Sequence, residues 1–333
     1  MRARNFLANV LTSPQNFVNL LIVFIAYVLR LEKVSGQPVI VDFEPVNICN
    51  FSCPYCPVTY YNTTKKNLNL EEFKAVLNKF PRALRIKLQG MGEPFLNKSL
   101  PEFINLTTAR GVWCEVITNG SVVDGEKLGV IEQTENFQLT ISIDAAEKAT
   151  FEKIRLGGDF QEIVSNLGAL AAKTKLNVAA WMVVSEDNKD QVEKVIKLLA
   201  EINVHTLGLQ MVVVDYGKKE LIPKTVGKRV SYENRDAYYK SLRTCAKRNG
   251  VRLNISDRLY TKRKPCLWPW VGVFVDVAGN IVPCCRIGDA SIFNLGNIHE
   301  VGFGAIWNSP AYKGFRSRHK ENNLPEFCKS CYR

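Results

Sequence analysis

The sequence is poor in histidine, has fewer acidic than basic residues, and lacks long apolar runs. Its three histidines, His205, His299 and His319, do not stand at a spacing typical of metal ligands. The longest unbroken apolar run, residues 20–29, is about half the roughly 20 residues that a membrane-spanning helix needs. Low-complexity tracts, heptad runs and repeats at solenoid spacing are absent. These absences argue against a spanning segment, exclude coiled-coil and solenoid architectures, and leave the histidines without a role.

The composition is that of a folded globular protein. Apolar residues make up 46% of the 333 residues and charged residues 23%, which excludes a disordered chain. This length accommodates one large domain and one small one.

Basic charge is concentrated in one part of the chain. Lysine and arginine number 44 against 32 acidic residues, which gives a net charge of +12. Residues 216–264 alone hold 15 basic and 4 acidic residues. Such a field attracts phosphate, carboxylate or an anionic surface. The other interpretation is a solvated helix face.

The apolar run near the N-terminus has two open interpretations. Arg2 and Arg4 precede it, and Arg30 and Lys33 follow it. A signal peptide would have small residues where Arg30 and Lys33 stand. The segment is therefore either a helix docked on the protein or a helix lying in a membrane interface. We expect a cytoplasmic protein, either free or peripheral on the cytoplasmic face of the membrane.

Strand-like and helix-like segments alternate along the middle of the chain. The expected strands are 39–47, 84–89, 113–118, 137–144, 177–184 and 207–214, with helices over 70–79, 99–110, 124–132, 147–173 and 189–202. Such alternation predicts an α/β fold with a parallel sheet, and six units suit a partial (β/α)6 TIM-like barrel. In the fourth strand, polar Gln138, Thr140, Ser142 and Asp144 alternate with apolar residues. This pattern predicts a lumen lined to hold a polar ligand.

Three of the ten cysteines follow the first expected strand. Cys49, Cys53 and Cys56 have the spacing CxxxCxxC and therefore lie on a loop at the rim where barrel chemistry takes place. Three thiolates can hold three irons of a [4Fe–4S] cluster and leave the fourth iron free to bind a small molecule. The alternatives are a zinc site that lacks one ligand, or incidental thiols.

A second cysteine group lies near the C-terminus. Cys266, Cys284 and the terminal pair Cys328 and Cys331 predict a site of four thiolates, for either zinc or an iron–sulfur cluster. Gly279 stands in the turn of a predicted β-hairpin that would bring Cys266 and Cys284 together. The remaining Cys114 and Cys245 are predicted core residues. The predicted organisation is a helix within 1–38, a barrel over 39–215, a basic bridge over 216–264 and a small Cys-rich domain over 265–333.

The first cysteine motif, CNFSCPYC, resembles the signature of radical S-adenosylmethionine (radical SAM) enzymes. Later segments strengthen the resemblance. The run from Gly90 to Pro94 is similar to the family's Gly-Gly-Glu-Pro motif, with Met91 inserted between the glycines. Thr118-Asn119-Gly120, Ser142-Ile143-Asp144 and Arg155 are similar to later parts of the family pattern.

The resemblance implies a mechanism and a set of SAM contacts. The open iron would chelate the amino and carboxylate groups of SAM, Glu93 would engage its ammonium group, and Ser142 and Asp144 would reach its ribose. One electron from the cluster would cleave SAM, and the resulting 5′-deoxyadenosyl radical would abstract a substrate hydrogen. The residues that the resemblance assigns to SAM are Gly90, Gly92, Glu93, Asn119, Ser142, Asp144, Arg155 and Val183.

The second cysteine group resembles a shortened SPASM domain, the twitch form that holds one auxiliary cluster. The spacing Cys-x12-Gly-x4-Cys from Cys266 to Cys284 is similar to the opening of that domain. The resemblance implies one auxiliary [4Fe–4S] cluster bound by Cys266, Cys284, Cys328 and Cys331. Cys285 is left over: it is a buried residue, a ligand in place of Cys284, or a hydrogen-atom donor to a substrate radical.

The leading functional expectation is dehydrogenation or epimerisation of an anionic small molecule, such as a phosphorylated, nucleotide-linked or lipid-linked sugar. The alternatives are a maturase that modifies a ribosomally made peptide, and a non-catalytic iron–sulfur or zinc scaffold. A flavodoxin or ferredoxin is the expected electron donor. Nucleic acid is not an expected partner, because aromatic and basic residues do not interleave.

Overall fold

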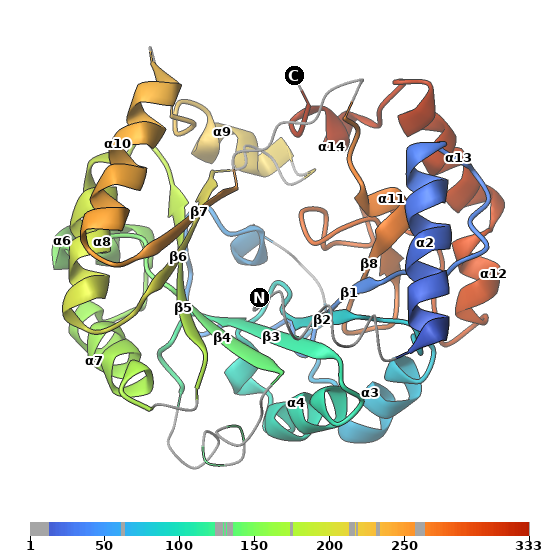
Figure 1. The fold of residues 1–333 in the computed structure, drawn as a ribbon, viewed down its shortest axis with the longest axis horizontal. Coiled ribbons are helices and arrows are strands. Elements are labelled where there is room, and N and C mark those ends of the chain that lie inside the picture. Colours follow the sequence, from blue (N-terminus) through green and yellow to red (C-terminus); the bar gives the residue numbers. More distant parts are fainter. Residues whose placement is uncertain are drawn as a thin grey trace.

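A single curved sheet organises the protein. The computed structural model describes residues 13–60, 64–123, 129, 131, 136–173, 176–212, 217, 219–230, 234–256 and 264–332. The strand order is β7-β6-β5-β4-β3-β2-β1-β8-β9 (Figure 1). The strands are β1 (Ile40–Phe43), β2 (Arg85–Leu88), β3 (Trp113–Thr118), β4 (Phe137–Ser142), β5 (Val178–Val184), β6 (Thr206–Met211), β7 (Arg252–Ser256), β8 (Gly272–Val275) and β9 (Ile281–Val282). Neighbouring strands from β7 to β8 are parallel, and β9 is antiparallel to β8.

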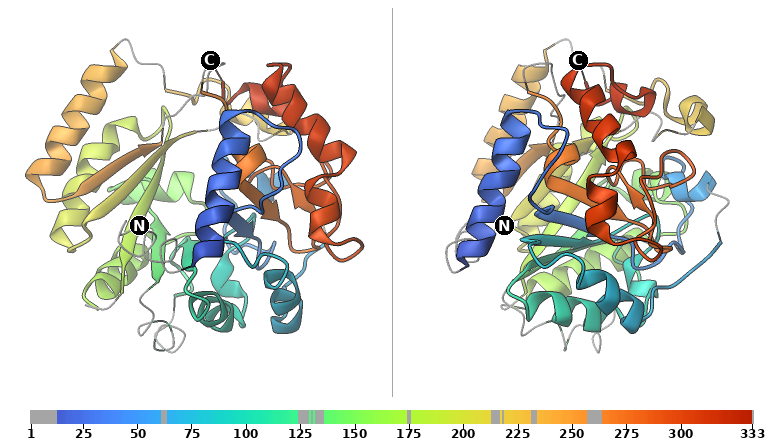
Figure 2. Two further views of the ribbon diagram at one scale, coloured as in Figure 1. Left: turned by 45° about the vertical axis from the view of Figure 1, so that its right-hand side comes forward. Right: turned by 90° about the vertical axis from the view of Figure 1, so that its right-hand side faces the viewer.

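Most of the helices cover the outer side of this sheet, which gives the molecule the shape of an open barrel (Figures 1 and 2). The helix bounds are α2 (Pro14–Val28), α3 (Leu70–Leu77), α4 (Leu100–Thr108), α6 (Lys148–Ile154), α7 (Phe160–Ala171), α8 (Val192–Glu201), α9 (Ile222–Thr225), α10 (Arg235–Arg248), α11 (Trp268–Val271), α12 (Phe303–Trp307), α13 (Pro310–Lys320) and α14 (Glu326–Lys329). Of these, α9 and α14 lie at the opening of the barrel. The predicted α/β class with a parallel sheet is confirmed. The helix expected over 124–132 falls almost wholly outside the described residues.

Capping residues fix where several helices begin. Asn69 and Glu72 form a reciprocal capping box at the start of α3, and Asp159 caps α7. These side chains satisfy backbone N–H groups that the first helical turn leaves without partners. The start of α7 follows Gly157 and Gly158, so the helical stretch expected over 147–173 forms the two helices α6 and α7.

The parallel sheet extends beyond the six expected strands at both edges. At one edge β7 pairs with β6, and it comes from the stretch that the sequence analysis assigned to a basic bridge. Its alternate residues Arg252, Asn254 and Ser256 are exposed, so the strand lacks the apolar run of a buried parallel strand. At the other edge, β8 of the predicted hairpin pairs in parallel with β1. The hairpin is confirmed by the antiparallel pairing of β8 with β9.

Helix α2 is docked by one face and exposed on the other. The Asn19 side chain exchanges two hydrogen bonds with the backbone of Gln37, and the Tyr27 hydroxyl donates to the carbonyl of Pro265 at 3.0 Å. The opposite face exposes the apolar side chains of Phe17, Val18, Leu21, Phe24, Ile25 and Val28. Among the described residues, we find no helix whose length and apolar character would let it cross a membrane.

Candidate active site

The loop that carries Cys49, Cys53 and Cys56 lies directly after β1. The Phe51 backbone N–H donates to Cys49 Sγ at 3.4 Å, and the Cys56 N–H donates to the Cys53 carbonyl at 3.1 Å. Ser52 N–H donates to the carbonyl of Leu156, which ties the loop to the end of α6. All ten cysteines lie in the described part of the chain, and none of them forms a disulfide there. The predicted position of the motif, at the end of the first strand, is confirmed.

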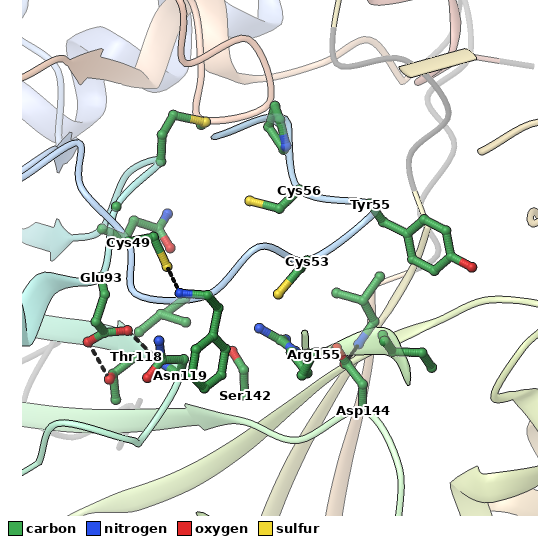
Figure 3. A pocket seen from close by; sticks show the side chains of 18 of the residues that line it. Cys49, Cys53, Tyr55, Cys56, Glu93, Thr118, Asn119, Ser142, Asp144 and Arg155 are labelled. Carbon is green, nitrogen blue, oxygen red and sulfur yellow. Dashed lines mark hydrogen bonds and ion pairs between the residues drawn. The ribbon is translucent and has the colours of Figure 1, made fainter. Parts of the chain in front are cut away.

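Glu93 lies in the loop after β2, next to the cysteine loop. Its backbone N–H donates to the Ile48 carbonyl at 2.8 Å, which fixes this loop against the cysteine loop. Its carboxylate accepts hydrogen bonds from Thr118 Oγ1 at 2.5 Å and from the Asn119 N–H at 2.7 Å (Figure 3). Burial raises the pKa of Glu93, and these hydrogen bonds oppose the rise because they favour the carboxylate.

Asp144 and Arg155 form a buried ion pair beside Cys53. Arg155 Nε lies 2.6 Å from Asp144 Oδ2, and the Val183 N–H donates to Asp144 Oδ1 at 2.7 Å. Both Asp144 oxygens therefore position protein groups. Its predicted contact with a ribose stays a prediction, as do the other predicted SAM contacts. Burial raises the pKa of Cys53, and the Arg155 charge opposes that rise.

These residues surround one cavity of about 220 Å³. The three cysteines of the first motif line it together with all eight residues predicted to bind SAM, namely Gly90, Gly92, Glu93, Asn119, Ser142, Asp144, Arg155 and Val183. Figure 3 shows the labelled side chains, apart from that of Tyr55, converging on this space. Residues that sequence reasoning did not single out as ligands also line it, including Tyr55, Gln89 and Thr118. The only sequence signal that Tyr55 would line the cavity was its position between Cys53 and Cys56.

The donor set fits an iron–sulfur cluster. Among the described residues, we find no group of three or more His, Cys, Asp or Glu side chains placed to hold one metal ion. In a [4Fe–4S] cluster each thiolate binds a different iron, so the sulfurs surround a larger group than one ion. Cys49 and Cys53 each influence the pKa of Cys56, which burial raises to about 12. Binding irons must therefore displace protons from these thiols.

The four C-terminal cysteines also come together. Cys266 and Cys331 both raise the pKa of Cys284, and all three other thiols raise that of Cys328. The Cys266 N–H donates to the Tyr332 hydroxyl at 2.8 Å. This arrangement of thiols suits the second [4Fe–4S] cluster, with Cys266, Cys284, Cys328 and Cys331 as its predicted ligands.

The surroundings of Cys285 differ from those of the four predicted ligand cysteines. Its pKa is raised first by burial and then by Asp42 and Cys284, and the positive charges of Lys87 and Arg286 oppose that rise. Cys285 does not line the cavity of Figure 3. Its role as a hydrogen-atom donor stays a prediction.

Glu44 connects the two halves of the site and was not predicted. Its carboxylate accepts hydrogen bonds from the Met91 N–H at 2.8 Å and from the Val277 N–H at 3.1 Å. It thereby joins the loop after β2 to the β8–β9 hairpin. Burial and the nearby charges of Asp276 and Asp289 raise the pKa of Glu44 to about 7. An acidic residue directly after a buried strand was the available sequence signal.

We expect Glu44 to make the protein less stable as the pH rises from about 4.5 to about 7. A carboxyl group with a higher pKa in the folded chain binds more protons when folded, so rising pH favours unfolding. The contribution is on the order of 3 kcal/mol. Glu44→Gln should flatten this part of the pH dependence of the urea midpoint. An equal slope in the variant and the parent would contradict the assignment.

Met91, the residue inserted in the glycine motif, lies between two cavities. It lines the cavity of Figure 3 and also a second cavity of about 480 Å³. A Cβ atom on Gly288 would lie 2.2 Å from Met91 Cε, so the two residues are in close contact. Met91 therefore packs against the loop that follows Cys284 and Cys285.

Comparison with known families identifies the class of protein. Residues 43–199 match the radical SAM superfamily, and residues 266–332 match the SPASM iron–sulfur cluster-binding domain. The chain is a radical SAM enzyme with a C-terminal SPASM domain. SAM and [4Fe–4S] clusters are its cofactors.

Similar proteins include two curated relatives. PqqA peptide cyclase of Xanthomonas euvesicatoria pv. vesicatoria is 22% identical over 90% of this chain and 81% of its own length. AdoMet-dependent heme synthase of Oleidesulfovibrio alaskensis is 21% identical over 84% of this chain and 77% of its own length.

Two solved structures of the same protein, SuiB, are similar to this chain. Streptococcus suis SuiB bound to S-adenosylmethionine matches with a TM-score of 0.69 and 13% identity, over 88% of this chain and 70% of SuiB. SuiB bound to precursor peptide SuiA matches with a TM-score of 0.67 and 12% identity, over 84% of this chain and 67% of SuiB. At such low identity these matches support the fold.

Proposed function

We propose that this enzyme modifies a peptide. The observation that carries the proposal is the similarity to PqqA peptide cyclase, which spans 90% of this chain and 81% of the relative and therefore includes both cluster domains. This proposal replaces the expected dehydrogenation or epimerisation of an anionic sugar-like molecule. The peptide maturase was the alternative in the sequence analysis.

The second cavity supports a substrate larger than a sugar. It adjoins the first cavity at Met91 and lies between the loop after the cysteine motif and the SPASM hairpin. A segment of peptide in this space would lie next to the cavity predicted to bind SAM. Its described lining includes Glu44, Asp276 and Asp289, and Lys66 is the one cation among these described residues. This charge balance does not favour an anionic substrate.

Among the described residues of the basic segment, many cations lie on a helix outside the sheet and not at the mouth of the site. Several of the segment's described cations, including Lys240, Arg243 and Lys247, lie on α10, which packs outside the sheet against α8 and β7. Lys228 does approach the site, but it pairs with Asp187 at 2.8 Å. The solvated helix face, one of the two interpretations of this charge, therefore accounts for α10.

Several residues have defined tasks in this proposal. A cluster on Cys49, Cys53 and Cys56, when bound, supplies the electron that cleaves SAM to a 5′-deoxyadenosyl radical. Glu93, held by Thr118 and Asn119, offers a fixed carboxylate to the SAM ammonium group. The buried wall around them keeps water and stray hydrogen donors away from the radical.

The test measures 5′-deoxyadenosine formed by the reconstituted enzyme with SAM and a flavodoxin-type donor. Small-molecule and peptide fractions of a cell extract are added separately, each with and without prior protease digestion. We expect the peptide fraction to stimulate product formation at least about tenfold, and digestion to remove the effect. Stimulation by the small-molecule fraction, resistant to protease, would overturn the peptide proposal. No 5′-deoxyadenosine in any reaction would favour a non-catalytic scaffold.

We also propose that α2 rests on a membrane surface. Its outward face exposes Phe24 to 58% and Leu21 to 47%, and basic residues flank the helix in the sequence. Leu21→Glu with Phe24→Glu should reduce binding to vesicles of phosphatidylcholine and phosphatidylglycerol at least about tenfold. Val301→Glu, an exposed apolar residue elsewhere, is the matched control. The proposal would be overturned if the parent protein did not bind the vesicles, or if it dimerised through this face of α2.

A further inference from the structure

The Arg286 side chain contacts one of the auxiliary thiols. Arg286 follows Cys284 and Cys285 directly, in a turn where the Ile287 N–H donates to the Cys284 carbonyl at 3.1 Å. Its side chain turns to the C-terminal end of the chain, where Nη1 lies 2.9 Å from Cys331 Sγ.

This contact joins two ligand segments that lie far apart in the sequence. Cys284 and Cys331 are both predicted ligands of the auxiliary cluster, and Arg286, two residues after Cys284, donates from its side chain to Cys331. The Nη1–Sγ distance of 2.9 Å is short for a donor to sulfur, so the guanidinium charge lies directly against the ligand atom. Lys329 also lies among these cysteines but pairs with Glu326 in the same short helix.

Hydrogen bonds to ligand sulfurs and positive charge beside a cluster stabilise its more electron-rich form. We propose that Arg286 raises the reduction potential of the auxiliary cluster and so makes it a better one-electron acceptor. The inference rests on Cys331 as a ligand and does not depend on which substrate the enzyme modifies. Arg286 is a positioning residue, because it acts through a ligand sulfur.

The experiment isolates the auxiliary cluster. In a Cys49→Ala, Cys53→Ala, Cys56→Ala background the first cluster cannot bind, and electron paramagnetic resonance during a redox titration follows the second cluster alone. Arg286→Gln keeps a hydrogen-bond donor on a shorter side chain but removes the positive charge. Arg286→Leu removes both the donor and the charge. We expect the leucine variant to lower the equilibrium constant for reduction at least tenfold, which is 59 mV for one electron. The glutamine variant should show a smaller shift.

Lys329→Gln is the matched control, because it removes a nearby positive charge that does not contact a ligand sulfur. Unchanged midpoints in both Arg286 variants, with iron retained, would overturn the proposal. An equal shift in Lys329→Gln would overturn it as well, since net charge alone would then explain the effect. Loss of auxiliary iron in Arg286→Leu, Arg286→Gln and Arg286→Lys would assign Arg286 to cluster assembly instead.

A further variant tests the premise separately. Cys331→Ala in the same background should lose the auxiliary cluster signal. If it keeps about four irons and an unchanged spectrum, the ligand assignment is wrong rather than the effect of Arg286. The titration uses neither SAM nor substrate, so failure of the peptide proposal would leave its result unaffected.

Discussion

Replacing Cys49, Cys53 and Cys56 together by alanine is expected to abolish SAM cleavage. Each thiol lines the cavity of Figure 3, and each is predicted to bind one iron of the first cluster. Without that cluster the electron that cleaves SAM has no donor beside the cavity. We expect 5′-deoxyadenosine formation to fall at least about a thousandfold, and bound iron to fall from about eight to about four per chain.

Cys245→Ala is the matched control for this prediction. Cys245 lies on α10, partly exposed, and belongs to neither cysteine group. Its loss should leave iron content and product formation close to those of the parent. The cluster assignment would be contradicted by a triple variant that still binds about eight irons or still forms 5′-deoxyadenosine at the parental rate.

The second large effect is expected from Gly92→Ala. A Cβ atom at this position would lie 2.2 Å from the Val46 carbonyl oxygen and 2.6 Å from that of Ile48. Both are backbone atoms of the segment that leads into the cysteine loop, so one loop must move. The Glu93 N–H would then lose its 2.8 Å hydrogen bond to Ile48, and the Glu93 carboxylate would be displaced. A displacement of about 1 Å in a catalytic site can reduce a rate about 100-fold.

The measurement is 5′-deoxyadenosine formation by reconstituted Gly92→Ala protein, with iron content and circular dichroism as checks on cluster loading and folding. Gly314→Ala is the matched control, because Gly314 lies in α13 and nothing stands within 4 Å of an added Cβ. Gly314→Ala should keep parental activity and gain slight helix stability. Parental activity in Gly92→Ala would show that the close approach of the two loops is not required.

Much of the site was predictable because its chemistry is local in the sequence. The spacing of Cys49, Cys53 and Cys56 and the alternation of polar residues in β4 need no long-range contact to be recognised. The parallel sheet then brings the ends of β1 to β5 to one rim. For that reason the predicted SAM residues, from Gly90 in one loop to Val183 in β5, line a single cavity.

Other residues could not be assigned because their role depends on distant partners. In the sequence Glu44 is an ordinary acidic residue. Its role is visible only in the structure, where the Val277 N–H of the hairpin lies 3.1 Å from its carboxylate. In the sequence Met91 is only an insertion in a glycine motif, and its contact with Gly288 is visible only in the structure. The N-terminal apolar run left two interpretations open, because the sequence shows its apolar residues but not which face of the helix docks.

The sequence by itself determined the chemistry of this protein: two cysteine groups, the loops predicted to hold SAM, and the α/β class of the fold. Thiol spacing and strand periodicity are short-range properties, so composition and order along the chain suffice to define them. Only the tertiary structure decided how the SPASM hairpin joins the barrel, through the pairing of β8 with β1, and that Arg286 contacts Cys331. These contacts join residues from distant parts of the chain, and packing alone selects such partners.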